Sequence, residues 1–539
     1  MEGKPHKKTI KSVWLILLAG VILVMGQLPF VLRTFHAPPD TYYPFLDKVF
    51  PADFVYAGII RLGMERVWQV SYPPVWEPHV PGLIYIFYLM LGKLHALIPL
   101  DSFSLFALFR VIGGLLYLSA GAMLLRQLVG PIKAKVAFVF FLITEPLPFL
   151  GMRSLLVPDV NHWLWDYFDA VRRAGMVPPH YTFGSGLAML SLVVFLQSWT
   201  KKNAWMLALA SGMFFVSGMI YAAPVIGIGV GLLAGGIGWA IYKRREVYKV
   251  MGICIYGLAG LAALLLLRME VTKGFPWIFW HWETVFNAPE FHIFDGYLFS
   301  IGWLTPFLLL FFISIVRKRI PLEVFIAAGY GFSVLLVFPF VNLLSLSSYR
   351  LVQGSQIVGL AAVSSIGWSF WGSVKNKLVR HLRWLWLGCM FVSSLWFSGA
   401  VTYLSTERLW PYADNIYFRK SELSALSFLN QSAPKGSVVL ALVNPSTYIM
   451  GFAPVHTIIG YQGVYYRRES EYDAELALTT AIFNGYTSKE AARRFILDHR
   501  VGFVYGEVLS APGLAFYPDT LRLIYNRDGF VIYKVVAQR

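Results

Sequence analysis

A series of long apolar runs between Ser12 and Tyr403 constrains the fold more than any other feature of the sequence. The first run, SVWLILLAGVILVMGQLPFVL, ends at Leu32 and is long enough to cross a bilayer as a helix. Hydrophobic residues make up 57% of the chain and charged residues only 14%, a composition that excludes an ordinary soluble protein. The sequence therefore predicts an α-helical protein that crosses the membrane many times.

Lysine and arginine cluster in the short segments between the apolar runs, which is the pattern of orientation signals. We expect the clusters to face the cytoplasm. Because these clusters account for the net charge of +17, the charge does not indicate a nucleic-acid partner, and none is expected. Successive clusters then require two crossings between them. On this basis the chain has about eleven spans, with the N-terminus cytoplasmic and the C-terminus extracytoplasmic. The expected spans lie near residues 13–32, 103–127, 135–151, 181–199, 203–220, 223–242, 249–267, 298–316, 321–341, 355–372 and 383–403.

One apolar segment, residues 81–100, does not fit this alternation. Counting it as a span would turn Lys133 and Lys135 outward. We therefore expect it to lie flat in the outer membrane interface, paired with a second helix that begins at Ala52. The alternative is that residues 81–100 do cross the membrane and that the charge rule fails locally.

Acidic residues gather in the loops expected outside the membrane. Asp40 follows the first span, Glu77 lies further along the same loop, and Asp159 lies in the second outer loop. Arg350 stands at the start of a later span. Because acidic side chains at the edge of the hydrocarbon are costly, their presence indicates a functional site at the lipid boundary.

The chemistry open to such a site is limited by what reaches the outer face. Nucleotide sugars are confined to the cytoplasm, so group transfer outside needs a donor that arrives through the membrane, such as a sugar on a polyprenyl phosphate. Arg350 at the headgroup level would stabilise the leaving phosphate. Asp40 would take the proton of the acceptor hydroxyl as a general base. The sequence contains no P-loop or dinucleotide fingerprint in a credible context.

Each of these residues also has a purely structural interpretation. Asp40 could cap a helix that begins near Tyr42, and Asp159 could cap a helix after Pro158. Glu77 and His79 could only anchor an interfacial helix. Arg350 could extend its guanidinium to the membrane interface without binding substrate.

The order of these motifs resembles the GT-C superfamily of membrane glycosyltransferases. The resemblance is strongest to the aminoarabinose transferases of lipid A and the protein O-mannosyltransferases. In these families an acidic residue follows the first span, and a His-Pro-Pro or Glu-x-His-x-Pro motif opens the second interfacial helix. An Arg-to-Asp stretch follows the third span. It covers roughly the first 180 residues by motif. The matching residues here are Asp40, Glu77, His79, Pro81, Arg153 and Asp159.

The resemblance implies a catalytic role for Asp40 and Asp159, and it implies substrate binding by Glu77, His79 and Arg153. The sequence departs from the family at two points. Thr41 follows Asp40, where the mannosyltransferases have a second acidic residue, and the Pro-Pro pair is replaced by Val80-Pro81-Gly82. Divalent-metal dependence varies across the superfamily, so a metal is left open and no other cofactor is assigned.

The composition changes after the last span. We expect a transmembrane catalytic domain over residues 1–404, with a first outer loop at 33–102, and a soluble extracytoplasmic α/β domain over 405–539. This second domain could contact a sugar acceptor or could be a cap that stabilises the outer loops. Its expected elements are a helix at 421–432, a strand at 436–443, a helix opened by a capping box at Thr487 and Glu490, a strand at 501–506 and a hairpin at 521–536 turning between Asn526 and Gly529.

The predicted function is transfer of a sugar from a polyprenyl-phosphate-linked donor to a glycan, lipid or protein acceptor, with membrane lipids as the surroundings. The main rival is a lipid or glycan transporter or flippase without transferase activity. Transporters usually carry charged residues near the membrane midplane, whereas the spans here are almost uncharged. A noncatalytic scaffold is a third class, and it gives no reason for carboxylates from two loops to converge.

Overall fold

The computed structural model describes the chain in segments that form two compact units. The helical unit comprises Met1–Val31, Phe109–Leu266 and Asn287–Leu409, and the loop-and-sheet unit comprises Leu32–Leu108, Leu267–Phe286 and Trp410–Arg539. Each unit is therefore built from segments that are distant in the sequence. The described residues are 13–46, 48, 51–65, 67–144, 170–242, 247–278, 301–317, 321–337, 340, 355–404, 416–460 and 469–536.

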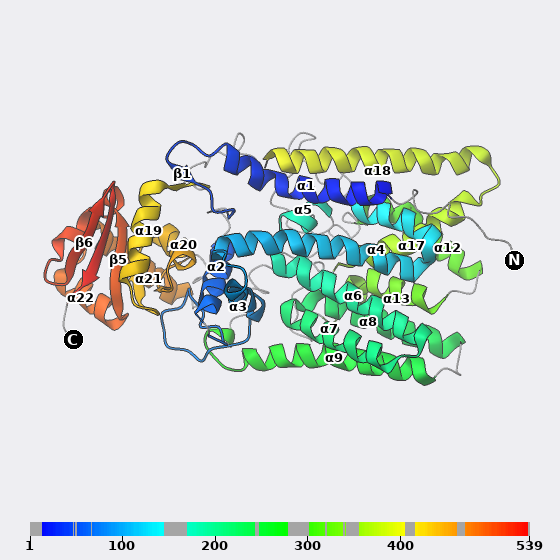
Figure 1. Cartoon of the computed structure of the whole chain (residues 1–539), viewed down its shortest axis with the longest axis horizontal. Coiled ribbons are helices and arrows are strands. Elements are labelled where there is room, and N and C mark those ends of the chain that lie inside the picture. Colours follow the sequence, from blue (N-terminus) through cyan, green and yellow to red (C-terminus); the bar gives the residue numbers. More distant parts are fainter. Residues whose placement is uncertain are drawn as a thin grey trace. The chain divides into compact units, whose positions relative to one another are not determined.

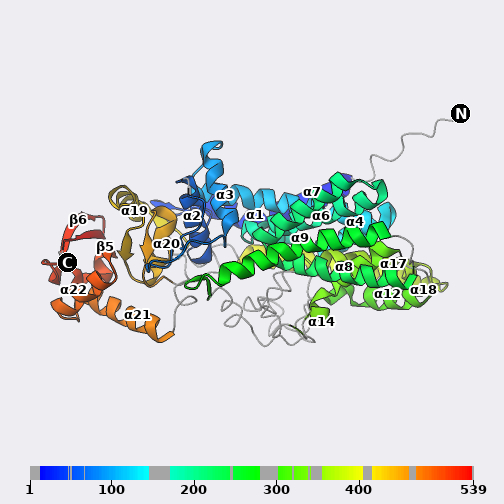
Figure 2. The same ribbon diagram turned by 90° about the horizontal axis from the view of Figure 1, so that it is seen from below.

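Helices make up the described part of the helical unit (Figures 1 and 2). They occupy the described parts of all the predicted spans. Four are long and apolar enough to cross a membrane by length and composition, namely α1, α4, α6 and α9, so the predicted total of about eleven crossings stays a prediction. The helices are α1 (Val13–Phe35), α4 (Ser102–Ile143), α5 (Ala170–Gly175), α6 (Pro179–Lys201), α7 (Ala204–Ile220), α8 (Ala222–Tyr242), α9 (Val247–Val271), α12 (Thr305–Arg317), α13 (Leu322–Gly331), α14 (Ser333–Val337), α17 (Ile357–Gly372) and α18 (Lys377–Leu404).

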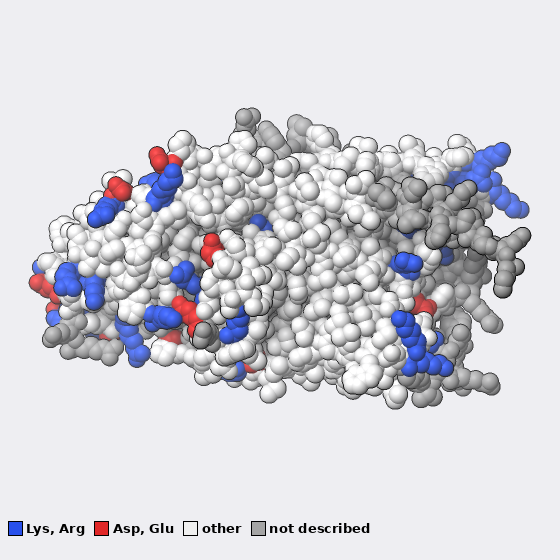
Figure 3. All heavy atoms as spheres, in the orientation of Figure 1, with Lys and Arg blue, Asp and Glu red and all other residues white. Residues whose placement is uncertain are grey.

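The helix α4 contains two of the predicted spans, and it breaks between them. Gly130 has φ 77° and ψ 165°, which no helical residue adopts, and Pro131 follows it. Proline suits the first turn of a helix because its missing N–H would have no partner there. On the face seen in Figure 3, charged side chains are sparse over the long helices and gather at one end of them, as expected for segments that contact lipid.

The first loop belongs to the loop-and-sheet unit and contains two short helices, α2 (Pro51–Met64) and α3 (Ile86–Lys93). A 3₁₀ turn, η2 (Leu94–Ala96), extends α3. Together α3 and η2 rise only about 18 Å, well short of the thickness of the hydrocarbon core, about 30 Å. Residues 81–100 therefore do not form a helix that could cross a bilayer, and their flat placement in the interface stays a prediction.

The C-terminal part of this unit is a five-stranded mixed sheet in the order β4-β3-β5-β7-β6. The strand β3 pairs in parallel with both β4 and β5, whereas β7 pairs antiparallel with β5 and β6. The strands are β3 (Val438–Leu440), β4 (His456–Thr457), β5 (Val501–Glu507), β6 (Leu521–Arg527) and β7 (Phe530–Val535), and the helices are α19 (Lys420–Ser432), α20 (Val443–Phe452), α21 (Glu469–Asn484) and α22 (Lys489–Asp498).

The two helices, the strand at 501–506 and the hairpin predicted for this region are confirmed. The strand predicted at 436–443 is shorter, because β3 ends at Leu440 and Val443 begins α20, and one helix cap belongs to a different residue than predicted. Ser488, not Thr487, is the N-cap of α22, and its Oγ accepts a hydrogen bond from the N–H of Ala491 at 3.2 Å. The hairpin turns at Asp528 and Gly529, which both have positive φ. Two such residues suit the type I′ turn that matches the twist of paired strands.

Aromatic packing joins the first loop to the C-terminal segment within the loop-and-sheet unit. Phe54 on α2 is fully buried. Its ring contacts Phe103 and also three rings of the C-terminal segment, those of Phe418, Tyr448 and Phe452. Buried aromatic side chains contribute large apolar areas, so the two segments stabilise one another through a shared core.

The closest approach in the first loop occurs where α2 crosses α3. A Cβ atom at Gly92 would lie 1.9 Å from the carbonyl oxygen of Ile60, and one at Gly63 would lie 2.1 Å from that of Leu89. Only glycine on both helices permits this crossing.

We expect Gly92→Ala to lower the free energy of unfolding by about 1–3 kcal/mol, because the added methyl group forces the helices apart. Thermal unfolding of the purified protein in detergent measures this effect. Gly212→Ala is the matched control, since Gly212 also lies within a helix but has no atom within 4 Å of its Cβ position. Equal stability of the two variants would contradict the close crossing.

Candidate functional site

Asp40 lies on a tight turn directly after α1. The N–H of Thr41 donates to the carbonyl of Pro38 at 3.1 Å, and Asp40 has φ 67°. Proline at the second position and a left-handed residue at the third are the marks of a type II turn, and aspartate tolerates that conformation better than most residues. The Asp40 side chain is 91% exposed, so its carboxylate is open to an incoming molecule.

The C-terminal segment fixes this turn from outside. The strand β1 (Thr41–Tyr42) pairs antiparallel with β2 (Phe418–Arg419). The N–H of Lys420 donates to the carbonyl of Asp40 at 2.8 Å, and its Nζ lies 3.5 Å from Oδ1 of Asp40. The residues after Asp40 therefore form a strand, and the structural interpretation of Asp40 as the cap of a helix near Tyr42 is wrong.

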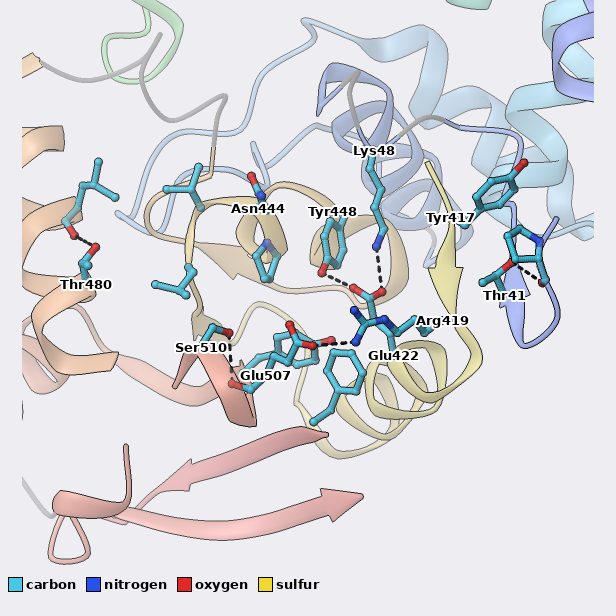
Figure 4. A pocket seen from close by; sticks show the side chains of 17 residues that line it. Thr41, Lys48, Tyr417, Arg419, Glu422, Asn444, Tyr448, Thr480, Glu507 and Ser510 are labelled. Carbon is cyan, nitrogen blue, oxygen red and sulfur yellow. Dashed lines mark hydrogen bonds and ion pairs between the residues drawn. The ribbon is translucent and has the colours of Figure 1, made fainter. Parts of the chain in front are cut away.

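A cavity of about 620 Å³ opens beside the turn, within the loop-and-sheet unit (Figure 4). The two neighbours of the Pro39-Asp40 pair, Pro38 and Thr41, belong to its wall. The rest of the wall comes from the first loop and from β2, α19, α20, α21, β5 and β7. Its other lining residues are Lys48, Tyr417, Arg419, Glu422, Leu442, Val443, Asn444, Pro445, Leu476, Tyr448, Thr480, Tyr505, Glu507, Ser510 and Phe530.

A buried network of polar groups forms one side of the cavity (Figure 4). Nζ of Lys48 lies 2.9 Å from Oε2 of Glu422 and 4.0 Å from the ring centre of Phe418. The Tyr448 hydroxyl donates to Oε1 of the same carboxylate. Burial lowers the pKa of Lys48, and the Glu422 carboxylate opposes that shift. Burial and the nearby Tyr505 and Glu422 raise the pKa of Tyr448 well above its usual value, so this phenol stays protonated.

A second ion pair lies closer to solvent. Nη1 of Arg419 is 2.8 Å from Oε1 of Glu507, and both side chains are partly exposed. Arg419 stands beside Phe418 in β2, the strand that pairs with the residues following Asp40. None of these cavity residues was predicted as a site residue. Their only sequence signal was the general expectation that the C-terminal domain could contact a sugar acceptor.

His79 and Glu77 lie in a loop closed by Gly82, which pairs with Val70 through two backbone hydrogen bonds of 2.8 and 3.0 Å. The N–H of Tyr72 donates to Nε2 of His79 at 2.9 Å, and Nδ1 lies 2.8 Å from the carbonyl oxygen of Glu77. An accepting Nε2 places the proton on Nδ1, so the ring is neutral. Burial lowers the pKa of His79 and favours the same state.

Residues in the last turn of α9 and directly after it hold this motif from the other side. The N–H of Leu83 donates to the buried Oε2 of Glu270 at 2.8 Å, and Lys273 forms an ion pair with the same oxygen at 2.8 Å. Nε1 of Trp277 donates to the carbonyl of Val80 at 2.7 Å. A Cβ atom at Gly82 would lie within 3 Å of the Trp277 ring. Glycine at this position, where the sequence departs from the family motif, is therefore required by packing.

The remaining predicted site residues, Arg153, Asp159 and Arg350, lie outside the described residues. Of those described, Asp40 lies on a turn whose Pro38 and Thr41 line the large cavity, and His79 faces His456 and Trp277. A cluster of three or more His, Cys, Asp or Glu that could hold a metal ion does not occur in the described part of the chain.

No protein-family model matches the sequence, and no curated protein matches it. Solved structures are similar over almost the whole chain, and two of them illustrate the match. ArnT from Cupriavidus metallidurans, bound to undecaprenyl phosphate, has a TM-score of 0.53 at 11% identity, and the match covers 98% of each chain. The fold is that of the GT-C membrane glycosyltransferases. AglB, an oligosaccharyltransferase from Archaeoglobus fulgidus in complex with an inhibitory peptide and a dolichol-phosphate, has a TM-score of 0.52 at 11% identity over 97% of this chain and 74% of that chain. The GT-C fold predicted from the motifs is thus confirmed.

The two facing histidines make the stability of the loop-and-sheet unit depend on pH. Burial lowers the pKa of both, and for His456 the neighbouring His79 adds to the shift. The unfolded chain therefore binds more protons than the folded chain below about pH 6.5, and the free energy of unfolding falls as the pH drops through that range.

We expect the unfolding temperature to decrease between pH 7 and pH 5, measured on the purified protein. The double substitution His79→Gln and His456→Gln should flatten this dependence, because glutamine does not titrate. An unchanged slope in the double variant would contradict the assignment of neutral histidines.

Proposed function

We propose that the protein is a glycosyltransferase that moves a sugar from a polyprenyl-phosphate-linked donor to an acceptor on the extracytoplasmic face of the membrane, with Asp40 as the general base. The observation that carries this proposal is the position of Asp40. In a chain with a GT-C fold, its exposed carboxylate stands on a braced turn after the first membrane-length helix, and two residues of that turn, Pro38 and Thr41, line a cavity.

The nature of the donor is supported by the similar structures. ArnT was solved with undecaprenyl phosphate and AglB with a dolichol-phosphate, both of which are lipid phosphates. A donor of that kind would place its reacting sugar at the membrane surface, where α1 ends and the turn of Asp40 begins. A cationic side chain would then have to stabilise the phosphate as it leaves, and we assign this role to Arg350, with Arg153 as a further substrate contact.

The proposed transfer step involves the acceptor hydroxyl, the donor sugar on its lipid phosphate, and the Asp40 carboxylate. The acceptor hydroxyl oxygen attacks the anomeric carbon of the donor sugar, and its proton passes to the Asp40 carboxylate. The bond between the anomeric carbon and the phosphate oxygen breaks, and the electron pair leaves with the lipid phosphate. A positioned base contributes typically about 10²- to 10⁴-fold to such a step. Asp159 is proposed to orient the substrates.

The geometry around Asp40 suits this role. The carbonyl of Asp40 accepts from Lys420, and that of Pro38 accepts from Thr41, so the backbone on both sides is held. A carboxylate on a restrained turn reaches the same point in every cycle, which favours a near-attack arrangement. The two ring nitrogens of His79, by contrast, are both occupied by backbone groups, and we propose that His79 anchors the loop while Glu77 is the candidate for contact with substrate.

We expect Asp40→Asn to reduce sugar transfer by about a hundredfold or more while leaving folding intact. Asparagine keeps the shape of the side chain and tolerates the left-handed conformation, but it cannot take the proton. The assay is transfer from a synthetic polyprenyl-phosphate sugar to membrane extract by the purified protein.

Asp528→Asn is the matched control, because Asp528 is also an exposed aspartate with positive φ in a turn. It should transfer at the wild-type rate. Near-normal transfer by folded Asp40→Asn would remove Asp40 from catalysis. Movement of labelled lipid across vesicles by a wild-type protein that transfers no sugar would instead support the transporter alternative.

A further inference from the structure

The cavity beside the Asp40 turn has the size of a binding site for a small molecule. Its volume of about 620 Å³ lies within the range of about 300–1,000 Å³ usual for ligand pockets. Its wall is built from two distant parts of the sequence, the first loop and the C-terminal segment, which share one core in the loop-and-sheet unit. Such a cavity is therefore formed by the folded unit and does not belong to a single loop.

The charges that line the cavity are balanced in pairs. Lys48 is paired with Glu422, and Arg419 is paired with Glu507. These four are the only charged side chains among the described lining residues. A phosphate or carboxylate ligand would meet two carboxylates whose partners are already engaged, whereas a neutral ligand would leave both pairs intact. The electrostatics thus favour a neutral ligand.

The uncharged polar groups of the wall are mostly acceptors. The hydroxyls of Thr41, Thr480 and Ser510 each donate to a backbone carbonyl of their own segment, at 2.8, 2.7 and 3.3 Å respectively. A hydroxyl that has donated its proton still has lone pairs to offer. Asn444, which is exposed at the start of α20, adds one amide carbonyl and two N–H donors. A ligand with several hydroxyl groups would satisfy this set, because it can donate many hydrogen bonds and accept a few.

Apolar side chains lie between these polar groups. Leu442, Pro445, Leu476 and Phe530 belong to the same wall. Mixed walls of this kind suit the C–H faces and hydroxyl edges of a sugar ring, whereas a lipid chain would leave the polar groups without partners.

We infer that this cavity binds a neutral saccharide, and that the saccharide is the part of the acceptor that presents a hydroxyl group to Asp40. The first half of this inference depends only on the cavity. The second half rests on the proposed function, and it follows from Pro38 and Thr41, which lie on either side of the Pro39-Asp40 pair and line the cavity. The acceptor is thus of the glycan class, among the glycan, lipid and protein acceptors that the sequence left open.

Saturation-transfer NMR on the purified full-length protein in detergent tests the first half. The probes are the neutral disaccharides maltose, cellobiose and mannobiose, with inorganic phosphate and a short neutral peptide as competitors. We expect saturation transfer to at least one disaccharide and no displacement by either competitor. Binding of none of the three disaccharides, or displacement by phosphate or by the peptide, would overturn the inference.

Two variants locate the binding in this cavity. Asn444→Ala should weaken disaccharide binding by roughly three- to tenfold, as expected for the loss of one or two hydrogen bonds. Thr480→Trp should abolish it by filling the cavity. Asn526→Ala is the matched control, since Asn526 is an exposed asparagine of the hairpin that does not line the cavity, and it should bind as the wild type does. Equal binding by all three variants would place the saccharide elsewhere.

The same variants separate this inference from the proposed function. Asp40→Asn should still bind the disaccharide, because binding involves no donor and no proton transfer. If disaccharide binding is present but wild-type protein transfers no sugar, the cavity assignment stands and the proposed function fails. If transfer occurs at the wild-type rate in Thr480→Trp, the cavity is not an acceptor site and the proposed function stands.

Discussion

The pairing of two short strands, β1 and β2, with two residues each, determines the position of the turn that carries Asp40. The strands β1 and β2 join the residues after Asp40 to a segment that lies far along the sequence, at Phe418–Arg419. Two residues per strand contribute little stability by themselves. The pair persists because Phe54 and its aromatic neighbours form a buried core next to it, and because Lys48 and Glu422 form an ion pair beside it. The position of the proposed base therefore depends on packing that involves neither Asp40 nor its turn.

The local features of the chain could be predicted from the sequence because local patterns encode them. Apolar runs predicted the helices, and the turn residues between Asn526 and Gly529 predicted the hairpin. The capping residue of α22 was misplaced by one position because Thr487 and Ser488 are adjacent and both suit a cap. Asp40 could be singled out because a carboxylate directly after a membrane helix is costly, but no pattern of residues indicated that a strand follows it.

The contacts that shape the site could not be predicted, because they join residues that are far apart in the sequence. Glu270 lies near the end of the apolar run that forms α9, and no pattern linked it to Leu83, 187 positions away. The same holds for Arg419 and Glu507, which are ordinary surface residues in their own segments. Their pairing emerges only from the fold. The likeness to ArnT at 11% identity fits this view, because apolar patterning can preserve a fold while the side chains that touch ligands change.

The shared core of the loop-and-sheet unit has a consequence for the synthesis of the protein. Lys48 and Glu422 are 374 positions apart, so at usual rates of translation the first loop waits roughly 20 to 75 seconds for its partner segment to leave the ribosome. During that interval the rings of Phe54 and its neighbours on α2 lack the surfaces that later cover them. The loop that carries the proposed catalytic group therefore leaves the ribosome long before the segment that completes its core, and until then a chaperone or the membrane surface itself has to shield its apolar side chains.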